Sequence, residues 1–183
     1  MQKTRSLILI TALVLTATVA QAEIELHQEH TFDARPGQTV SIDASFHRVE
    51  VKIQPGSVVH AVVDLSASSS SGKAERAIEE LTPVFSEKGD TIIIRSTRKG
   101  GWNWSTGKIK GEITVVMPPD LNLTVDSSSG SVTIEGDLGD ADVACDASSG
   151  SVTVRGAMKN LNIDTSSGSI KADVDRPLES FNA

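Results

Sequence analysis

Apolar and polar residues alternate in three copies of one pattern in the last third of the chain. The copies read LNLTVDSSSGSVTIEG over 121–136, ADVACDASSGSVTVRG over 141–156 and LNIDTSSGSIKAD over 161–173. When they are aligned on Gly130, Gly150 and Gly168, apolar residues stand seven and five positions before the glycine and two and four positions after it. This period of two is typical of half-buried strands, so each copy predicts two short strands with one apolar face.

A Ser-Ser-Gly-Ser stretch separates the two strands of each copy. Serine favours turns, and glycine adopts positive φ without steric cost. Each copy therefore predicts two strands around a corner, about one rung of a β-solenoid. A lone rung cannot bury its apolar face, whereas stacked rungs form a continuous apolar column. The predicted fold is all-β and β-solenoid-like or β-helix-like, and 121–173 holds its clearest repeats.

An earlier, degenerate copy of the pattern precedes these repeats. The stretch VSIDASFHRVEV, from Val40 to Val51, aligns with LTVDSSSGSVTI, from Leu123 to Ile134. This alignment places Val40, Ile42, Val49 and Val51 on inward positions. His47 then occupies the position of the glycine.

Residues 58–118 form a mixed insert between the copies. Three stretches predict strands: VVHAVVDLSA over 58–67, TIIIRS over 91–96 and GEITVVMP over 111–118. Residues 73–81 carry Ala74, Ala77, Ile78 and Leu81 at helical spacing, with Ser70 or Ser71 as a possible N-cap and Pro83 beyond the end. We expect one short amphipathic helix that covers a sheet face or a solenoid end.

The first 22 residues have the pattern of a cleavable signal peptide. Lys3 and Arg5 precede an apolar run over 7–19, and Ala20-Gln21-Ala22 supplies a small-x-small cleavage motif. We expect cleavage after Ala22, which leaves 23–183 as a single β-repeat domain. The predicted location is the periplasm, the extracellular space or the cell surface.

Charge and composition narrow the possible partners. The chain has 17 basic and 24 acidic residues, and residues 1–22 contain two of the basic ones, so the net charge of 23–183 is 15 − 24 = −9. Nucleic acid is disfavoured as a partner, because its affinity comes from Lys and Arg that neutralise phosphates. The only cysteine, Cys145, falls on an inward position and cannot form an internal disulfide.

These features together resemble the DUF4097 family of exported bacterial β-strand-repeat proteins, which are similar to head-GIN-domain proteins. The resemblance extends from about Phe32 to Asp173 and depends on the early copy, the mixed insert, MPPDLNLTV over 117–125 and the SSGSVTIEG-type repeats. It implies a β-helix-like fold in a surface or periplasmic setting, with a suggested adhesin role. It provides no catalytic residues to carry over.

Motifs for enzymatic or metal chemistry are not found in the sequence. The histidines are His27, His30, His47 and His60, and no HExxH or CxxC pattern includes them, so we interpret them as solvated or turn residues. The serines recur at equivalent repeat positions, and no GxSxG motif occurs. We therefore predict no catalytic residue, no cofactor and no transition metal.

An aspartate precedes each repeat glycine by four residues, at Asp126, Asp146 and Asp164, and Asp43 occupies the same place in the early copy. Stacking would place these carboxylates about 5 Å apart along one ridge. The ridge could bind Ca²⁺. Alternatively, the aspartates could bond the following serine amides in Asx turns, which is the interpretation we favour.

The segment RSTRKGGWNWSTGKIK, over 95–110, is basic in an acidic protein and contains both tryptophans. Trp102 and Trp104 would face the same side of an extended strand, beside Arg98, Lys99 and Lys108. These five residues are the predicted ligand-binding site, because tryptophan stacks on sugar rings and apolar surfaces. A hairpin that packs both rings on the protein's own sheet is the alternative.

The sequence thus favours a non-enzymatic exported protein that acts in binding or envelope scaffolding, with an envelope glycan or surface protein as the partner. One alternative is an envelope enzyme that acts on polysaccharide from a β-helix scaffold. Another is a structural or stress-related periplasmic protein with a protein partner.

Overall fold

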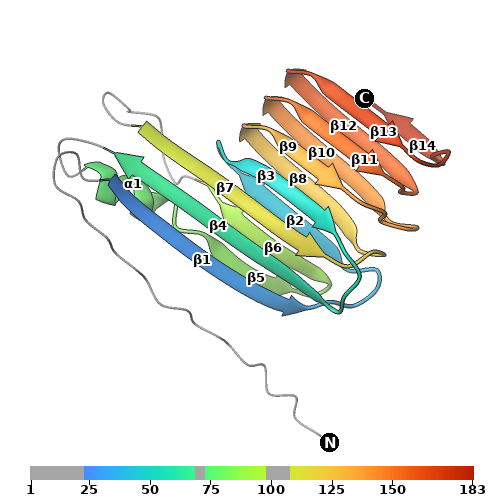
Figure 1. The fold of residues 1–183 in the computed structure, drawn as a ribbon, viewed down its shortest axis with the longest axis horizontal. Helices are drawn as coiled ribbons and strands as arrows, with labels where there is room; N and C mark the ends of the chain where they lie inside the picture. The colour runs from blue at the N-terminus through green and yellow to red at the C-terminus, as the bar shows by residue number, and fades with distance from the viewer. Residues whose placement is uncertain (1–22, 69–72, 98–107) are drawn as a thin grey trace, which may run out of the picture.

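The computed structural model describes residues 23–68, 73–97 and 108–183. Within them the chain forms one helix, α1 (Lys73–Glu80), and the strands shown in Figure 1. The strands are β1 (Glu23–Asp33), β2 (Thr39–Ala44), β3 (Arg48–Ile53), β4 (Val58–Ser68), β5 (Val84–Lys88), β6 (Thr91–Ser96), β7 (Lys108–Met117), β8 (Asn122–Ser129), β9 (Val132–Glu135), β10 (Asp142–Ser149), β11 (Val152–Gly156), β12 (Asn160–Ser167), β13 (Ile170–Val174) and β14 (Ser180–Asn182). The predicted signal peptide, 1–22, lies outside the described residues. No helix in the described ranges is long and apolar enough to cross a membrane.

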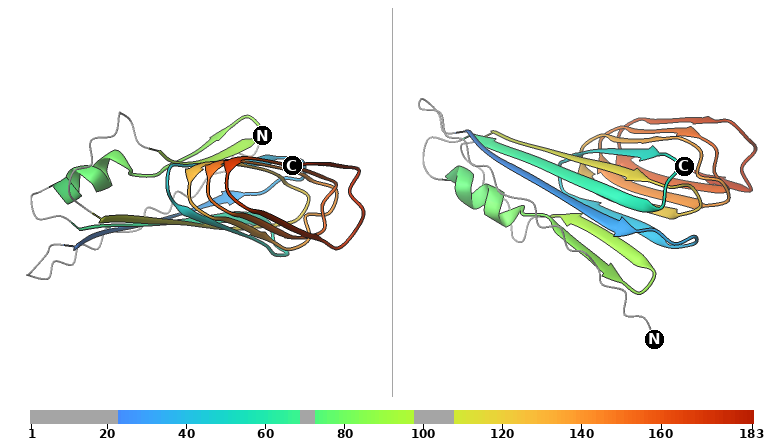
Figure 2. Two further views of the ribbon diagram at one scale, coloured as in Figure 1. Left: turned by 90° about the horizontal axis from the view of Figure 1, so that it is seen from above. Right: turned by 60° about the horizontal axis from the view of Figure 1, so that its bottom comes forward.

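The strands form two seven-stranded sheets that lie face to face (Figure 2). Sheet A has the order β1-β4-β7-β3-β9-β11-β13, and sheet B has the order β14-β12-β10-β8-β2-β6-β5. Buried aliphatic side chains from both sheets form one core. The predicted all-β, solenoid-like fold is confirmed.

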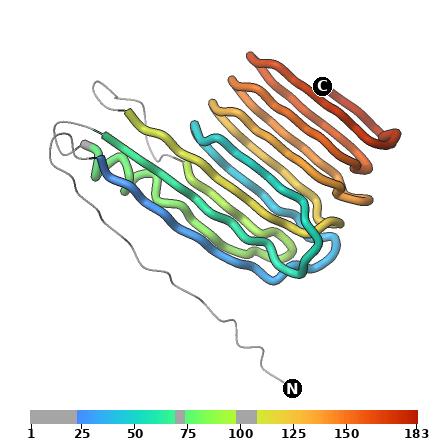
Figure 3. Tube along the Cα trace, in the orientation of Figure 1, coloured from blue at the N-terminus to red at the C-terminus, as the bar shows by residue number. Residues whose placement is uncertain are grey.

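The repeats stack as parallel rungs with matching positions in register, which Figure 3 shows as parallel turns of the tube. In sheet B, Cys145 pairs with Val125 on one side and with Ile163 on the other. In sheet A, Val154 pairs with Ile134. The predicted strand phase is correct, because these inward residues are almost fully buried.

The early copy is the rung β2–β3, and it stacks directly on the first clear repeat. Ile42 pairs with Val125, and Val51 pairs with Ile134. Both pairings follow the alignment made from the sequence. The early copy therefore belongs to the solenoid.

Strands β6 and β7 form a further rung that sequence comparison missed. Ile94 pairs with Ile42 in sheet B, and Val115 pairs with Val51 in sheet A, both in parallel. The stack therefore has the spatial order β6–β7, β2–β3, β8–β9, β10–β11, β12–β13. Ser96 and Glu112 hold the register positions of Ala44 and Arg48, so 97–111 correspond to only 45–47 in the β2–β3 rung. This longer segment hides the repeat from alignment.

Antiparallel strands and the helix close the end that precedes β6–β7. β4 pairs with β7 and β1, and β5 pairs with β6. The helix packs against β1 and β4 and lies at the end of the molecule away from the C-terminal strands (Figure 1). Its predicted apolar face is confirmed, since Ala74, Ala77, Ile78 and Leu81 are buried. Ser70 and Ser71, the predicted N-caps, lie outside the described residues.

The corner glycines are required mainly by close approach of the neighbouring rung. A Cβ on Gly150 would lie 2.0 Å from the carbonyl oxygen of Gly130, and one on Gly168 would lie 1.8 Å from that of Gly150. Gly150 also has φ of +140°, which L side chains rarely adopt. A side chain at these corners would therefore push adjacent rungs apart.

The last rung departs from the predicted burial. Ala172 holds an inward register position opposite Val154, yet it is exposed, and Ile170 is only partly buried. The alternation was predicted correctly, but burial also needs a following rung. At β13, the edge of sheet A, no further strand covers these side chains in the described part of the chain.

Candidate ligand-binding surface

The predicted site is centred on residues that lie outside the described ranges. Arg98, Lys99, Trp102 and Trp104 belong to 98–107, so their placement stays a prediction. Lys108 is described: it is the first residue of β7, it is exposed, and it pairs in register with Ser68 of β4.

A shallow groove of about 320 Å³ lies beside Lys108 on the outer face of sheet A, over β1, β4 and β7. Antiparallel pairing brings His27, Asp64 and Glu112 into one row across these strands. His27 Nδ1 contacts the Asp64 carboxylate, and Lys110 lines the groove two residues after Lys108. The groove therefore presents charges of both signs to solvent.

The strands that flank 98–107 are anchored by a buried histidine. His47 is fully buried, and its Nε2 lies 3.0 Å from Oγ of Ser96, the last residue of β6. Ser96 Oγ donates its hydrogen to the Leu81 carbonyl at 2.8 Å, so Nε2 must be the donor to Ser96. A Cβ on Gly111 of β7 would lie 2.3 Å from Cδ2 of His47, so only glycine leaves room for the ring.

His47 corrects the expectation that the histidines are solvated or in turns. It does occupy a corner, but no part of it is exposed, and burial lowers the pKa of its imidazole from 6.5 to about 4. With Nε2 as donor, the bare Nδ1 has no hydrogen-bond partner. His27 and His60 lie at the surface, as expected, and pair with Asp64 and Thr31.

The four aspartates do form a ridge, as the register Asp43–Asp126–Asp146–Asp164 shows. Partial burial, together with the charges of Asp43 and Asp146, raises the pKa of Asp126. Arg95 ends the row through a bond of 2.8 Å from Nε to Asp43.

The Asx turns that we favoured for these aspartates are not formed. Asp126, Asp146 and Asp164 lie inside β8, β10 and β12, where the backbone amides bond to neighbouring strands. In the described ranges no group of three or more His, Cys, Asp or Glu side chains could hold a metal ion.

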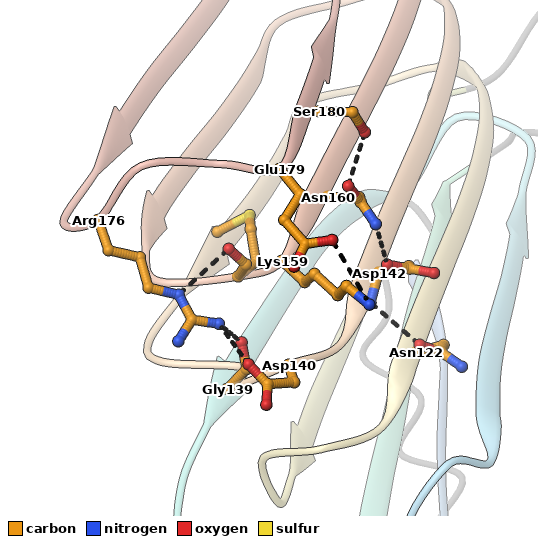
Figure 4. A network of polar contacts seen from close by, with 10 residues as sticks. Asn122, Gly139, Asp140, Asp142, Lys159, Asn160, Arg176, Glu179 and Ser180 are labelled. Carbon is orange, nitrogen blue, oxygen red and sulfur yellow. Dashed lines mark hydrogen bonds and ion pairs between the residues drawn. The ribbon is translucent and has the colours of Figure 1, made fainter.

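A second, larger groove of about 630 Å³ crosses the outer face of sheet B, and several of its polar side chains already form hydrogen bonds within the protein. Figure 4 shows the ladder that runs along its edge. Asn122 Oδ1 accepts the Asp142 amide at 3.0 Å, Asn160 Nδ2 donates to Asp142 at 2.7 Å, and Ser180 donates to Asn160 at 2.7 Å. We interpret this ladder as a structural clamp between rungs. The residues of this ladder recur at equivalent repeat positions in the sequence, but their hydrogen bonds were not predicted from it.

Cys145 is confirmed as a buried structural residue. It is free, and burial first, with the charges of Asp146 and Asp126, raises the pKa of its thiol to about 12. The reactive thiolate is therefore scarce at neutral pH.

The chain is also similar to known proteins. The model of DUF4097, described as Toastrack DUF4097, matches residues 38–175. No curated protein matches the chain.

Several solved structures are similar at low identity. One is a candidate cell adhesion protein from Clostridium sporogenes, with 10% identity, a TM-score of 0.31 and coverage of 86% of this chain and 98% of that chain. Another is a candidate adhesin from Parabacteroides distasonis, with 11% identity, a TM-score of 0.32 and coverage of 81% and 67%. A third is a candidate adhesin from Bacteroides fragilis, with 10% identity, a TM-score of 0.24 and coverage of 86% and 96%. The ligand of this chain has to be inferred from its own residues.

Proposed function

The chain belongs to the DUF4097, or Toastrack, family, and we propose that it is a non-enzymatic, exported binding or scaffolding protein that adheres to a glycan or surface partner at the cell envelope.

The length of the segment between the register positions Ser96 of β6 and Glu112 of β7 is the observation that carries the proposal. In the described repeats the corners are short and stack tightly on one another, whereas 97–111 stands in the place of 45–47. An insertion at a corner leaves the sheet ladders intact, and binding residues are often presented on loops held by a rigid scaffold. This insertion contains both tryptophans of the chain.

The groove on sheet A and the two tryptophans of the insertion together suit a ligand that has both hydroxyl groups and apolar ring faces. Lys110 lines the groove with His27 and Asp64, which offers donors and acceptors for hydroxyl groups, and the exposed Lys108 precedes Lys110 by two residues on β7. Stacking on Trp102 and Trp104 would supply the apolar contact. We therefore favour a glycan over a purely apolar ligand.

An enzyme that acts on polysaccharide has less support. The raised pKa of Asp126 is a property of general acids, and adjacent carboxylates occur in glycosidases. However, the aspartate row lies exposed on the outside of sheet B, where no cleft encloses a substrate between two carboxylates in the described residues. A turnover assay on envelope polysaccharides that Asp126→Asn abolishes would favour the enzyme.

A glycan array with the purified protein tests the binding proposal. Trp102→Ala/Trp104→Ala should abolish binding, while Lys108→Ala should weaken it. Lys88→Ala, on β5 at the edge of sheet B, is the matched control and should have no effect. Loss of β-sheet circular dichroism in the tryptophan variant would show that the rings belong to the core, and the site would be wrong.

A pull-down from envelope extract separates the two partner classes. Capture of one protein by the wild type but not by the tryptophan variant, without any glycan signal, would favour the structural or stress-related alternative. The intact mass of the exported protein tests the export proposal, and we expect Glu23 as the first residue. Retention of Met1 would contradict it.

A further inference from the structure

The end of the solenoid at β13 and β14 is open in the described part of the chain. β13 is the edge of sheet A, and β14 is the edge of sheet B. The opposite end is covered by α1 and antiparallel strands. Repeat proteins stay soluble when their terminal repeats present a polar outer face, but the inward positions of β13 are the apolar Ile170, Ala172 and Val174. Phe181 of β14 is 55% exposed.

The backbone of β13 presents a regular row of free groups at this edge. Val152 donates to the Ser169 carbonyl at 2.9 Å, and Asp175 donates to the Gly156 carbonyl at 3.1 Å. Alternate residues of a strand bond to opposite sides, so residues 171 and 173 also bond to β11. The N–H and C=O groups of Ile170, Ala172 and Val174 therefore point away from the protein.

We propose that this edge pairs with the same edge of a second copy, so that β13 and its symmetry mate form an antiparallel ladder about a two-fold axis at Ala172. Ala172 then faces Ala172 of the mate, and Ile170 faces Val174 of the mate. Each of these pairs joins residues whose free groups point outward, as the hydrogen-bonded positions of an antiparallel ladder require. The contact is isologous, and it closes as a dimer.

The charged residues of β13 favour the register with the axis at Ala172 over other registers that the backbone hydrogen bonds allow. Lys171 and Asp173 are exposed and form no ion pair with another described residue. With the axis at Ala172, Lys171 faces Asp173 of the mate twice, at a closely spaced ladder position. Moving the axis by one residue would place Lys171 opposite Lys171 or Asp173 opposite Asp173, which repel. Charged residues on an edge strand disfavour unspecific pairing with other strands. Here the charges of Lys171 and Asp173 are complementary to those of a second copy when the axis lies at Ala172.

The same axis brings the sheet B side of both copies together. β14 pairs only with Asn160–Asn162, so the rest of β12 is also a free edge. Phe181 lies over Leu161 on the inward row of sheet B. The contact would remove exposed ring surface from water, which favours association.

Charge reversal and restoration test the pairing. We expect the wild type to form dimers in sedimentation at concentrations up to about 100 µM, the range of a micromolar Kd. Lys171→Asp and Asp173→Lys should each give monomers, while the double variant Lys171→Asp/Asp173→Lys should dimerise again. Lys88→Asp makes the same charge change at the opposite edge and should remain dimeric. A monomeric wild type, or dimers in both single variants, would overturn the proposal.

A crosslink tests the axis itself. Ala172→Cys should form a disulfide-linked dimer on mild oxidation, because the two Cα atoms in a hydrogen-bonded antiparallel pair lie about 5.5 Å apart. Cys145 is buried and does not compete. Thr153→Cys, on the adjacent interior strand, should remain uncrosslinked. Head-to-tail stacking would instead give longer assemblies that Ala172→Cys does not link, and it would refute the two-fold arrangement.

Discussion

Acidification should destabilise the protein through His47, the fully buried imidazole that anchors the β6–β7 rung. Its Nε2 donates to Ser96, and Nδ1 has no partner, so a second proton would place an unpaired charge in the core. The folded state therefore holds the neutral ring.

The size of the effect follows from the shift in pKa. The pKa of His47 is about 4 in the folded protein and 6.5 in the unfolded chain. Below pH 6.5 the unfolded chain binds the proton first, so stability falls as the pH drops from 6.5 to 4 and then levels off. A shift of this size corresponds to about 3 kcal/mol, against a typical total of about 5–15 kcal/mol.

Urea unfolding at several pH values between 7 and 4 measures this loss. His47→Gln keeps a donor for Ser96 but does not titrate. Between pH 7 and pH 4 its free energy of unfolding should therefore fall by about 3 kcal/mol less than that of the wild type. His47→Phe serves as a second non-titrating variant if the Gln variant is poorly folded. Carboxylate titrations are common to all three proteins and cancel in the comparison. Equal pH dependence in wild type and variants would refute the assignment of a buried neutral His47.

Other predictions follow from the rung packing and the aspartate row. Gly150→Ala should lower stability by about 3 kcal/mol or more, because its Cβ meets a backbone carbonyl, whereas Ser151→Ala should be nearly neutral in urea melts. Val152→Asp should cost several kcal/mol, since Val152 is fully buried, and Thr153→Asp should be mild; equal losses would mean that the strand phase is wrong. Asp126→Asn should raise the Tm at neutral pH by relieving repulsion, and millimolar Ca²⁺ should leave the wild-type Tm nearly unchanged. A saturable rise with Ca²⁺ that this variant abolishes would identify a cation site.

Local signals explain why the repeats could be predicted. The alternation around Gly150 defined which side chains face inward, since a strand has a period of two whatever its partners are. If the corners of successive repeats stack on one another, residues at equivalent repeat positions pair. This predicts the observed pairing of Cys145 with Val125. The helix was recognised from the spacing of Ala77 and Leu81 for the same local reason.

The candidate site was less accessible to prediction. The groove near Lys108 requires β4 to pair with β1 on one side and with β7 on the other, and this antiparallel arrangement has no signature in residues close together in sequence. Burial of His47 likewise depends on Ser96 and Gly111, which lie far along the chain. The aspartates were expected in turns because Asp before serine favours them, but pairing on both sides of β8 holds Asp126 in an extended strand.

The sequence by itself determined the type of rung, its inward and outward faces and its glycine corners, because these depend on backbone sterics and on the hydrophobic period. The tertiary structure alone decided that β6–β7 precedes β2–β3 in the stack, since an insertion of 97–111 conceals that repeat. It also decided that Ala172 is exposed although its position is inward. Burial is a property of neighbours, and whether a neighbour exists at the end of a stack is not encoded in the alternation of the strand itself.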